Sequence, residues 1–266
     1  MASGKRINPS KPIRTKNWSQ IDHTEVKKGL EISYTDYLKP YAGDMFDIAS
    51  RCMPVIEKRM GVPLTKDMAS KILLLATDGG GFSSGETIGL AVWWGGFPDK
   101  EDSMIEFITH ESAHSWVLPF PEIWNEPIAT YVGNLVMIDM GYREEAERRI
   151  ASTINRARRL DPEFNLYDMD GKSNKPGVED LPENKVNDLH WGKSYWIWEQ
   201  MRAENPDVVA DYFKAKRKYA TTKTVKRYDD NNTVAVISIA MGRDLFPWFR
   251  EIGFDVDRKK ADVKFG

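Results

Sequence analysis

The chain has 266 residues, of which 41% are apolar and 29% charged, and its formal net charge is −2. This is the composition of an ordinary globular protein. The charge is nearly balanced and the basic residues are spread along the chain, so neither a nucleic-acid partner nor an anionic membrane surface is expected. No apolar run reaches the 18 residues of a membrane span, and the single cysteine, Cys52, excludes an internal disulfide.

Residues 1 to about 20 are polar and are predicted to form a flexible N-terminal lead-in. They lack the apolar segment of a secretory signal. An extracellular or cell-surface location is therefore favoured only if an export signal has been removed. After the lead-in, apolar spacing predicts a helix at 44–60, and short apolar runs predict strands at 71–77 and 87–94 around a glycine-rich turn at 78–85.

Helices dominate the remainder of the chain. Their predicted ranges are 103–116, 125–140, 143–160, 185–204, 206–218, 231–241 and 244–252. Strands followed by helices favour an α+β fold, with a small sheet packed on a predominantly helical body. The long polar segment 168–183 is the best candidate boundary. We therefore expect one domain from 21 to 266, with an N-terminal α/β part to about 167 and a C-terminal helical part from about 184.

The segment His110-Glu111-Ser112-Ala113-His114 lies within the helix predicted at 103–116. Residues four apart share one face of a helix, so His110 and His114 can present two imidazoles to one metal ion. Glu111 is rotated to the side, where its carboxylate can reach a water molecule rather than the metal. The alternative is a helix that carries two surface histidines without a metal.

Glu126 is the candidate third ligand, because a catalytic zinc uses three protein ligands and leaves one position open. It follows His114 by 12 residues, across a connection that contains Pro119 and Pro121. These prolines make the connection short and stiff, and Asn125 is a good N-cap residue for the next helix. The alternative for Glu126 is an ordinary first-turn acid that the helix dipole favours.

The two histidine positions, followed by Asn125-Glu126-Pro127-Ile128-Ala129, resemble the gluzincin metallopeptidases, both the enhancin-like or mucin-degrading group and the aminopeptidase N-type group. The stretch from Gly242 to Phe249 also resembles the end of the catalytic domain of the enhancin-like group. No Gly-x-x-His follows His114, so the metzincin class does not fit. The resemblance implies a zincin-like catalytic domain and a Zn²⁺ ion held by His110, His114 and Glu126.

The resemblance also implies hydrolysis by a metal-activated water, with Glu111 as the general base. His190 and Tyr195 are the candidate donors to the oxyanion, since gluzincins place a histidine or tyrosine some sixty residues after the glutamate ligand and His190 follows Glu126 by 64. Alternatively, Tyr195 packs in the core and His190 caps a helix. Thr130, four residues after Glu126, is the candidate that orients a ligand imidazole.

In these folds the strand before the motif helix lines the cleft and pairs with extended substrate, which predicts a cleft role for 88–94 and substrate contacts for Trp93 and Trp94. That strand lacks the acid with which aminopeptidases bind a free amine. We therefore expect a metalloprotease that acts as an endopeptidase on a protein or glycoprotein. The alternatives are a catalytically silent binding protein of the same fold and a zinc hydrolase of a non-peptide bond. The sequence does not predict the oligomeric state.

Overall fold

The computed structural model describes residues 21–27, 29–63, 71–75, 81–84, 87–91, 100–117, 124–166, 178, 181–221 and 228–264. The strands are β1 (His23–Lys27), β2 (Leu30–Tyr34), β3 (Lys71–Leu75), β4 (Phe82–Ser84) and β5 (Thr87–Ala91). The helices are α1 (Lys39–Met60), α2 (Glu101–Val117), α3 (Asn125–Asp139), α4 (Arg143–Arg158), α5 (Glu183–Glu204), α6 (Val208–Thr221), α7 (Asp230–Met241) and α8 (Phe246–Glu251). Two short 3-10 helices, η1 (Asp36–Leu38) and η2 (Arg258–Lys260), complete the described elements.

The five described strands form one mixed sheet in the order β1-β2-β3-β5-β4. Strands β2, β3 and β5 are parallel, and the two edge strands β1 and β4 run antiparallel to their neighbours. Strand β4 lies within the segment predicted as a glycine-rich turn, so that prediction was wrong over Phe82–Ser84. In the segment predicted to pair with substrate, 88–94, the described part is internal to the sheet, because β5 pairs with β3 on one side and β4 on the other; residues 92–94 lie outside the described residues.

The hairpin of β4 and β5 depends on a close aromatic contact. Phe82 lies opposite Gly89 in the register, and its ring occupies the space that a Cβ atom on Gly89 would need. A larger residue at Gly89 would displace the ring, so glycine lets the edge strand lie flat against β5. This contact holds β4 in place beside the helices that follow.

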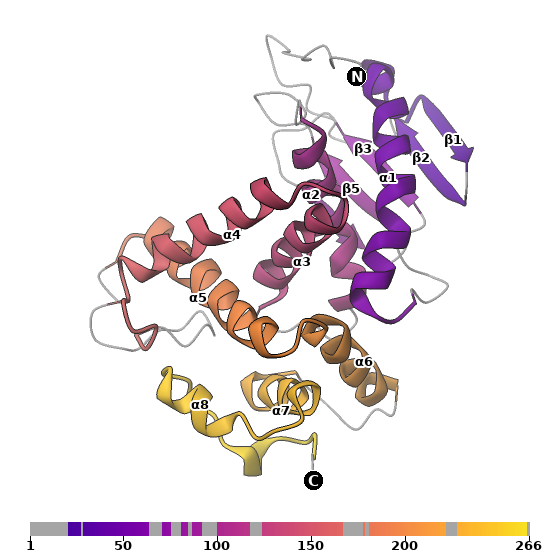
Figure 1. The fold of residues 1–266 in the computed structure, drawn as a ribbon. Helices are drawn as coiled ribbons and strands as arrows, with labels where there is room; N and C mark the ends of the chain where they lie inside the picture. Colours follow the sequence, from indigo (N-terminus) through magenta and orange to yellow (C-terminus); the bar gives the residue numbers. More distant parts are fainter. Residues whose placement is uncertain are drawn as a thin grey trace.

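Helix α1 lies along the sheet and also packs against α2 and α3 (Figure 1). It begins earlier than predicted, with a proline in its first turn, and ends at Met60 as predicted, with Gly61 as its C-cap. Gly61 has a φ of 68°, the left-handed conformation that glycine adopts at helix C-termini. The apolar side of α1 joins the common core through residues such as Met45, Ile56 and Met60, which have no exposed surface.

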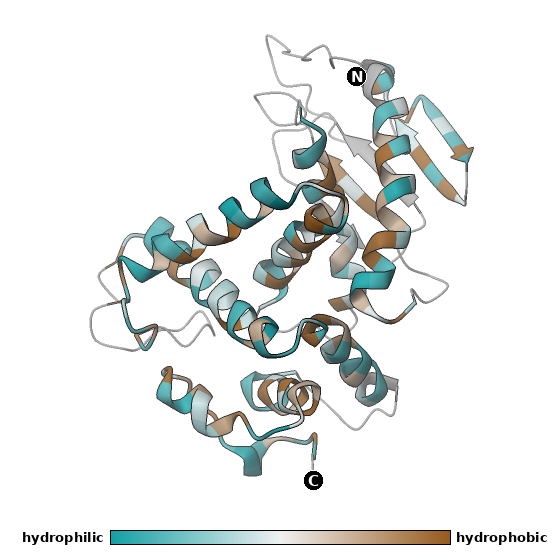
Figure 2. Cartoon of the chain, viewed as in Figure 1, coloured by the Kyte–Doolittle hydropathy of each residue, from teal (hydrophilic) through white to brown (hydrophobic). Residues whose placement is uncertain are grey.

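The helical body begins with α2 and α3 at the centre and continues through α4 and α5 to α7 and α8 at the far end (Figure 1). Figure 2 shows that α4 is mostly hydrophilic on the side that it turns to the viewer, whereas α7 carries more hydrophobic residues. Trp124, immediately before α3, links the two ends of the body, because its ring contacts those of Trp198, Phe249 and Phe254 at centroid distances of 5.9 to 6.2 Å. The elements after 180 therefore support the start of α3.

The predicted fold class is confirmed: the described residues form a small sheet packed on a mostly helical body. The division into parts at about 167 and 184 stays a prediction. Among the described helices, none has the length and apolar character needed to cross a membrane.

Candidate metal centre

Helix α2 is buried over most of its surface, although it carries many polar residues. The hydroxyls of Thr109 and Ser112 donate to the carbonyl oxygens four residues earlier, at 2.6 and 2.7 Å, so their burial leaves neither hydroxyl unpaired. His110 and His114 project from one side of the helix, and their Nε2 atoms lie 3.3 Å apart. Two imidazole nitrogens therefore converge on one point.

Glu126, in the first turn of α3, completes a triangle with these two nitrogens. Its Oε2 lies 3.5 Å from His110 Nε2, and its Oε1 lies 3.6 Å from His114 Nε2. Tetrahedral zinc with bonds of 2.0 to 2.1 Å requires ligand atoms about 3.3 to 3.4 Å apart. The three side chains thus fit a small divalent ion, and the half-exposed Glu126 leaves one side open to solvent.

Thr130 fixes the orientation of the His110 ring from one turn further along α3. His110 Nδ1 lies 3.0 Å from Thr130 Oγ1, and the Thr130 hydroxyl donates to the carbonyl oxygen of Glu126 at 3.0 Å. Because that hydroxyl already donates its proton to Glu126, it accepts from Nδ1–H of His110. The Nε2 lone pair of His110 is then free to bind a metal.

Asn125 plays the same part for His114, with its Oδ1 3.0 Å from His114 Nδ1. The prediction that Asn125 caps α3 was wrong: the helix already includes Asn125, and the cap position is Trp124, which makes no side-chain capping bond. The side chain of Asn125 faces α2 instead because the histidine offers it a buried hydrogen-bond donor. Each candidate ligand histidine therefore has its own acceptor, and both present Nε2 to the same point.

Glu111 lies beside the triangle, with its Oε1 3.7 Å from His110 Nε2 and only 5% of its side chain exposed. Burial raises its pKa to about 7, helped by the charges of Glu126 and Glu106 and opposed by that of His110. A carboxylate with such a pKa can take up and release a proton near neutrality. His110, Glu111 and His114 form one group whose ligand-type atoms all lie within 4.8 Å of one another.

The charges of the site act on both imidazoles and on the third candidate ligand. Burial lowers the pKa of His110, but the hydrogen bond to Glu126 and the charges of Glu111 and Glu106 outweigh this effect, and the pKa is raised overall. The pKa of His114 is lowered, first by burial and then by the neighbouring His110. The pKa of Glu126 is lowered, chiefly by its hydrogen bond with His110.

A cavity of about 300 Å³ opens onto these groups, and the edge strand forms its other wall. The lining residues are Gly81, Phe82, Ser83, His110, Glu111, His114, Asn125 and Glu126. Gly81 approaches Glu111 so closely that a Cβ atom at this position would overlap the carboxylate. Nothing in the sequence distinguishes this glycine from its neighbours. Its presence in a glycine-rich run was the only signal.

The remaining predicted site residues lie at different depths. The side chain of His190, on α5, is partly buried and is not among the residues that line the cavity, although its charge helps to lower the pKa of Glu126. Tyr195 is 2% exposed and its hydroxyl accepts from Asn134 Nδ2 at 3.4 Å, behind Thr130 rather than in the cavity. Trp93 and Trp94 lie outside the described residues.

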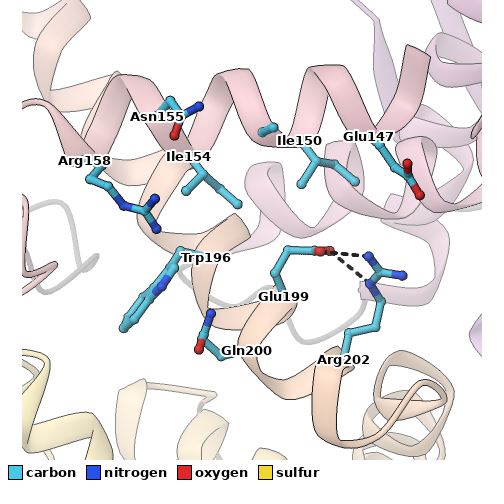
Figure 3. A pocket seen from close by; sticks show the side chains of 10 residues that line it. Glu147, Ile150, Ile154, Asn155, Arg158, Trp196, Glu199, Gln200 and Arg202 are labelled. Carbon is cyan, nitrogen blue, oxygen red and sulfur yellow. Dashed lines mark hydrogen bonds and ion pairs between the residues drawn. The ribbon is translucent and has the colours of Figure 1, made fainter. Parts of the chain in front are cut away.

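A second cavity, of about 270 Å³, lies between α4 and α5 (Figure 3). Its acids are already paired: Glu199 accepts from Arg202 at 2.7 Å and from the hydroxyl of Tyr131 at 2.5 Å, and Glu147 pairs with Arg143 at 2.9 Å. Carboxylates held by arginines do not offer a metal site. Among the described residues, the side chains able to bind a metal ion therefore come together at His110, Glu111 and His114 of α2, next to Glu126 of α3.

The chain matches no protein-family model and no curated protein. Solved structures are similar in fold. The match to native LTA4 hydrolase from yeast covers 85% of this chain and 38% of the hydrolase chain, with a TM-score of 0.57 and 14% sequence identity. The match to an aminopeptidase N family protein from Idiomarina loihiensis covers 92% of this chain and 47% of that protein's chain, with a TM-score of 0.61 and 9% sequence identity. A functionally unknown conserved protein from Bacillus anthracis has a TM-score of 0.53 and 12% identity over 87% of this chain and 48% of its own.

These similarities show the fold alone, because the identities are between 9% and 14%. The chain has the mostly helical α+β zincin-like fold that its sequence predicts. It spans less than half the length of each of these structures.

Proposed function

We propose that the protein is a zinc-dependent metallopeptidase of the gluzincin type that hydrolyses internal peptide bonds of a protein or glycoprotein. The observation that carries this proposal is the convergence of His110 Nε2, His114 Nε2 and the Glu126 carboxylate within 3.3 to 3.6 Å of one another. Glu111 lies directly beside them, in the lining of an open cavity. Two oriented imidazoles, one carboxylate and a separate base make up the donor set of a hydrolytic zinc site.

When bound there, zinc would polarise a carbonyl as a Lewis acid and lower the pKa of a water molecule. The proton transfers are assigned to the protein's own residues. Glu111 takes the proton of the attacking water on its carboxylate and delivers it to the leaving amine. Its raised pKa suits both steps, since one group must accept a proton and release it within each cycle.

His190 is the proposed donor to the oxyanion, because it is a histidine on α5 whose charge reaches the candidate ligand Glu126. Tyr195 is proposed instead as a positioning residue. Its hydroxyl is buried against Asn134 and Thr130, which puts it on the side of His110 away from the cavity. Burial and the charge of Glu106 also raise its pKa, so it stays protonated.

The endopeptidase preference is supported by the walls of the cavity. Its lining acids are Glu111 and Glu126, which the proposal already uses as base and ligand, and the described part of its edge strand contributes Phe82 and Ser83. The described lining therefore offers no further carboxylate to bind a substrate's free amine. An extended peptide can instead pair with the outer edge of β4, the last strand of the described sheet.

Zinc content and hydrolysis test the proposal together. Purified protein is expected to bind one zinc ion per chain and to cleave members of an internally quenched peptide library. Glu111→Gln should keep the zinc and lose hydrolysis, with Glu147→Gln, an exposed acid of α4, as the matched control. Absence of stoichiometric zinc, or unchanged hydrolysis by Glu111→Gln, would refute the proposal.

The similarity to LTA4 hydrolase gives one alternative some support, namely a zinc hydrolase of a non-peptide substrate with the same residues in the same roles. Zinc binding that depends on His110 and His114, without cleavage of any peptide but with Glu111-dependent hydrolysis of a small molecule, would favour it. A catalytically silent binding protein would bind zinc and hydrolyse neither class.

A further inference from the structure

His110 and His114 are both supported by neutral groups in this protein. Thr130 is the acceptor for the first imidazole and Asn125 for the second. Carboxylates commonly act on metal-bound histidines from this position, where they raise the basicity of the ring. A hydroxyl such as that of Thr130 orients the ring but supplies no negative charge.

Glu106 lies one helical turn before His110 on α2. Residues four apart on a helix have Cβ atoms about 5 to 6 Å apart on the same face, so Glu106, His110 and His114 form one row. The side chain of Glu106 begins against α3, beside Gly133. A Cβ atom on Gly133 of α3 would lie 3.0 Å from the carbonyl oxygen of Glu106 and 3.4 Å from its Cγ. The row of ligand side chains thus continues along α2 to a partly buried acid.

The neighbours of Glu106 leave its charge available to His110. Arg149 approaches it with Nη1 at 3.9 Å from Oε2, beyond hydrogen-bonding distance. The same guanidinium donates to Glu145 at 2.8 Å and lies 3.7 Å from Asp102, so three acids share one cation. Tyr195, on α5, is a further neighbour, and the charge of Glu106 helps to raise the pKa of its hydroxyl.

We propose that Glu106 is a positioning residue for the metal centre: its partly buried carboxylate, one turn before His110, supplies that imidazole with the negative charge that Thr130 lacks. The inference rests on the zinc-binding part of the proposed function and not on the peptidase activity. The charges agree with it, since Glu106 helps to raise the pKa of His110, while His110 and Arg149 oppose the burial that raises the pKa of Glu106.

Zinc affinity of the intact chain, measured by competition with a coloured chelator, tests this inference. Glu106→Gln keeps the shape of the side chain and removes its charge, and is expected to weaken zinc binding about tenfold. Adding Thr130→Asp returns a carboxylate to His110 from the other side and should restore most of the lost affinity. Glu101→Gln, an exposed acid in the first turn of the same helix, is the matched control and should bind zinc as the unmodified protein does.

Unchanged affinity in Glu106→Gln, or no recovery in the double variant, would overturn the inference. If Glu106→Gln does not fold, Glu106→Asp takes its place, because the shorter side chain holds its carboxylate farther from His110 and should also weaken zinc binding. Adding Thr130→Asp to that variant should again restore most of the lost affinity. The hydrolysis assay separates the two proposals. Zinc binding that responds to Glu106 in a protein that cleaves nothing would refute only the peptidase, and full hydrolysis with unaltered affinity in Glu106→Gln would refute only the role of Glu106.

Discussion

Gly81 approaches the proposed general base more closely than a side chain would allow. A methyl group there would lie 2.6 Å from Cγ of Glu111 and closer still to the carboxylate. Ordinary carbon contacts begin at 3.4 Å, so Gly81→Ala must push Glu111 back by about 1 Å or move the edge strand by the same amount.

A displacement of this size has a predictable effect on rate. Moving a catalytic group by about 1 Å costs on the order of 100-fold in kcat, or about 2.7 kcal/mol of transition-state stabilisation. The ligand atoms of His110, His114 and Glu126 are on other residues and keep their places. Gly81→Ala should therefore lose most of its hydrolysis while its zinc affinity stays the same.

The assay is steady-state hydrolysis of the best quenched peptide, with zinc affinity measured on the same preparation. Gly43→Ala is the control, because this helical glycine of α1 has nothing within 4 Å of its added Cβ. A Gly81→Ala variant with the kcat of the unmodified protein would show that Glu111 is not the base in this position. A variant that lost zinc as well would show that the edge strand and the ligands move together.

Three further outcomes follow from the same site. His190→Gln is expected to lower kcat about 100- to 1,000-fold if it donates to the oxyanion, whereas Tyr195→Phe should change kcat little; the reverse order would assign the donor to Tyr195. Asn125→Ala should weaken zinc binding about 10- to 100-fold by chelator competition, and unchanged affinity would exclude its role in orienting His114. As the pH is lowered, zinc affinity should begin to fall while the pH is still above the ordinary histidine pKa of about 6.5, because the pKa of His110 is raised and its imidazole must lose a proton before it can bind the metal. An affinity that falls only well below pH 6.5 would contradict the assigned charges.

The metal-type residues could be predicted from sequence because helix geometry alone sets their relation. Four-residue spacing places His110 and His114 on one face in any α-helix. Asn125 shows the limit of such reasoning: asparagine suits both a helix cap and a histidine acceptor, and only packing against α2 decides between the two. Tyr195 shows another limit, since the depth of a helical residue depends on the helices that cover it.

The sheet was harder to predict than the helices. Strand β4 has three residues, and the glycines around it are typical of turns, so no local pattern distinguishes it. Strands β1 and β2 were not predicted because their five-residue segments mix charged and apolar side chains. Which strand forms the edge depends on pairing between segments distant in the chain, and β5 became internal through contacts that its own composition does not encode.

The shortness of β4 limits how a polypeptide can lie beside it. Three residues span about 10 Å, so only a few backbone groups of a bound chain can be hydrogen-bonded along this edge. Such a short edge is also a poor template for pairing with a second copy of the protein at this side of the described sheet. Most of the selectivity for a long substrate must then come from side chains flanking the cleft, because the backbone contacts are the same for every sequence.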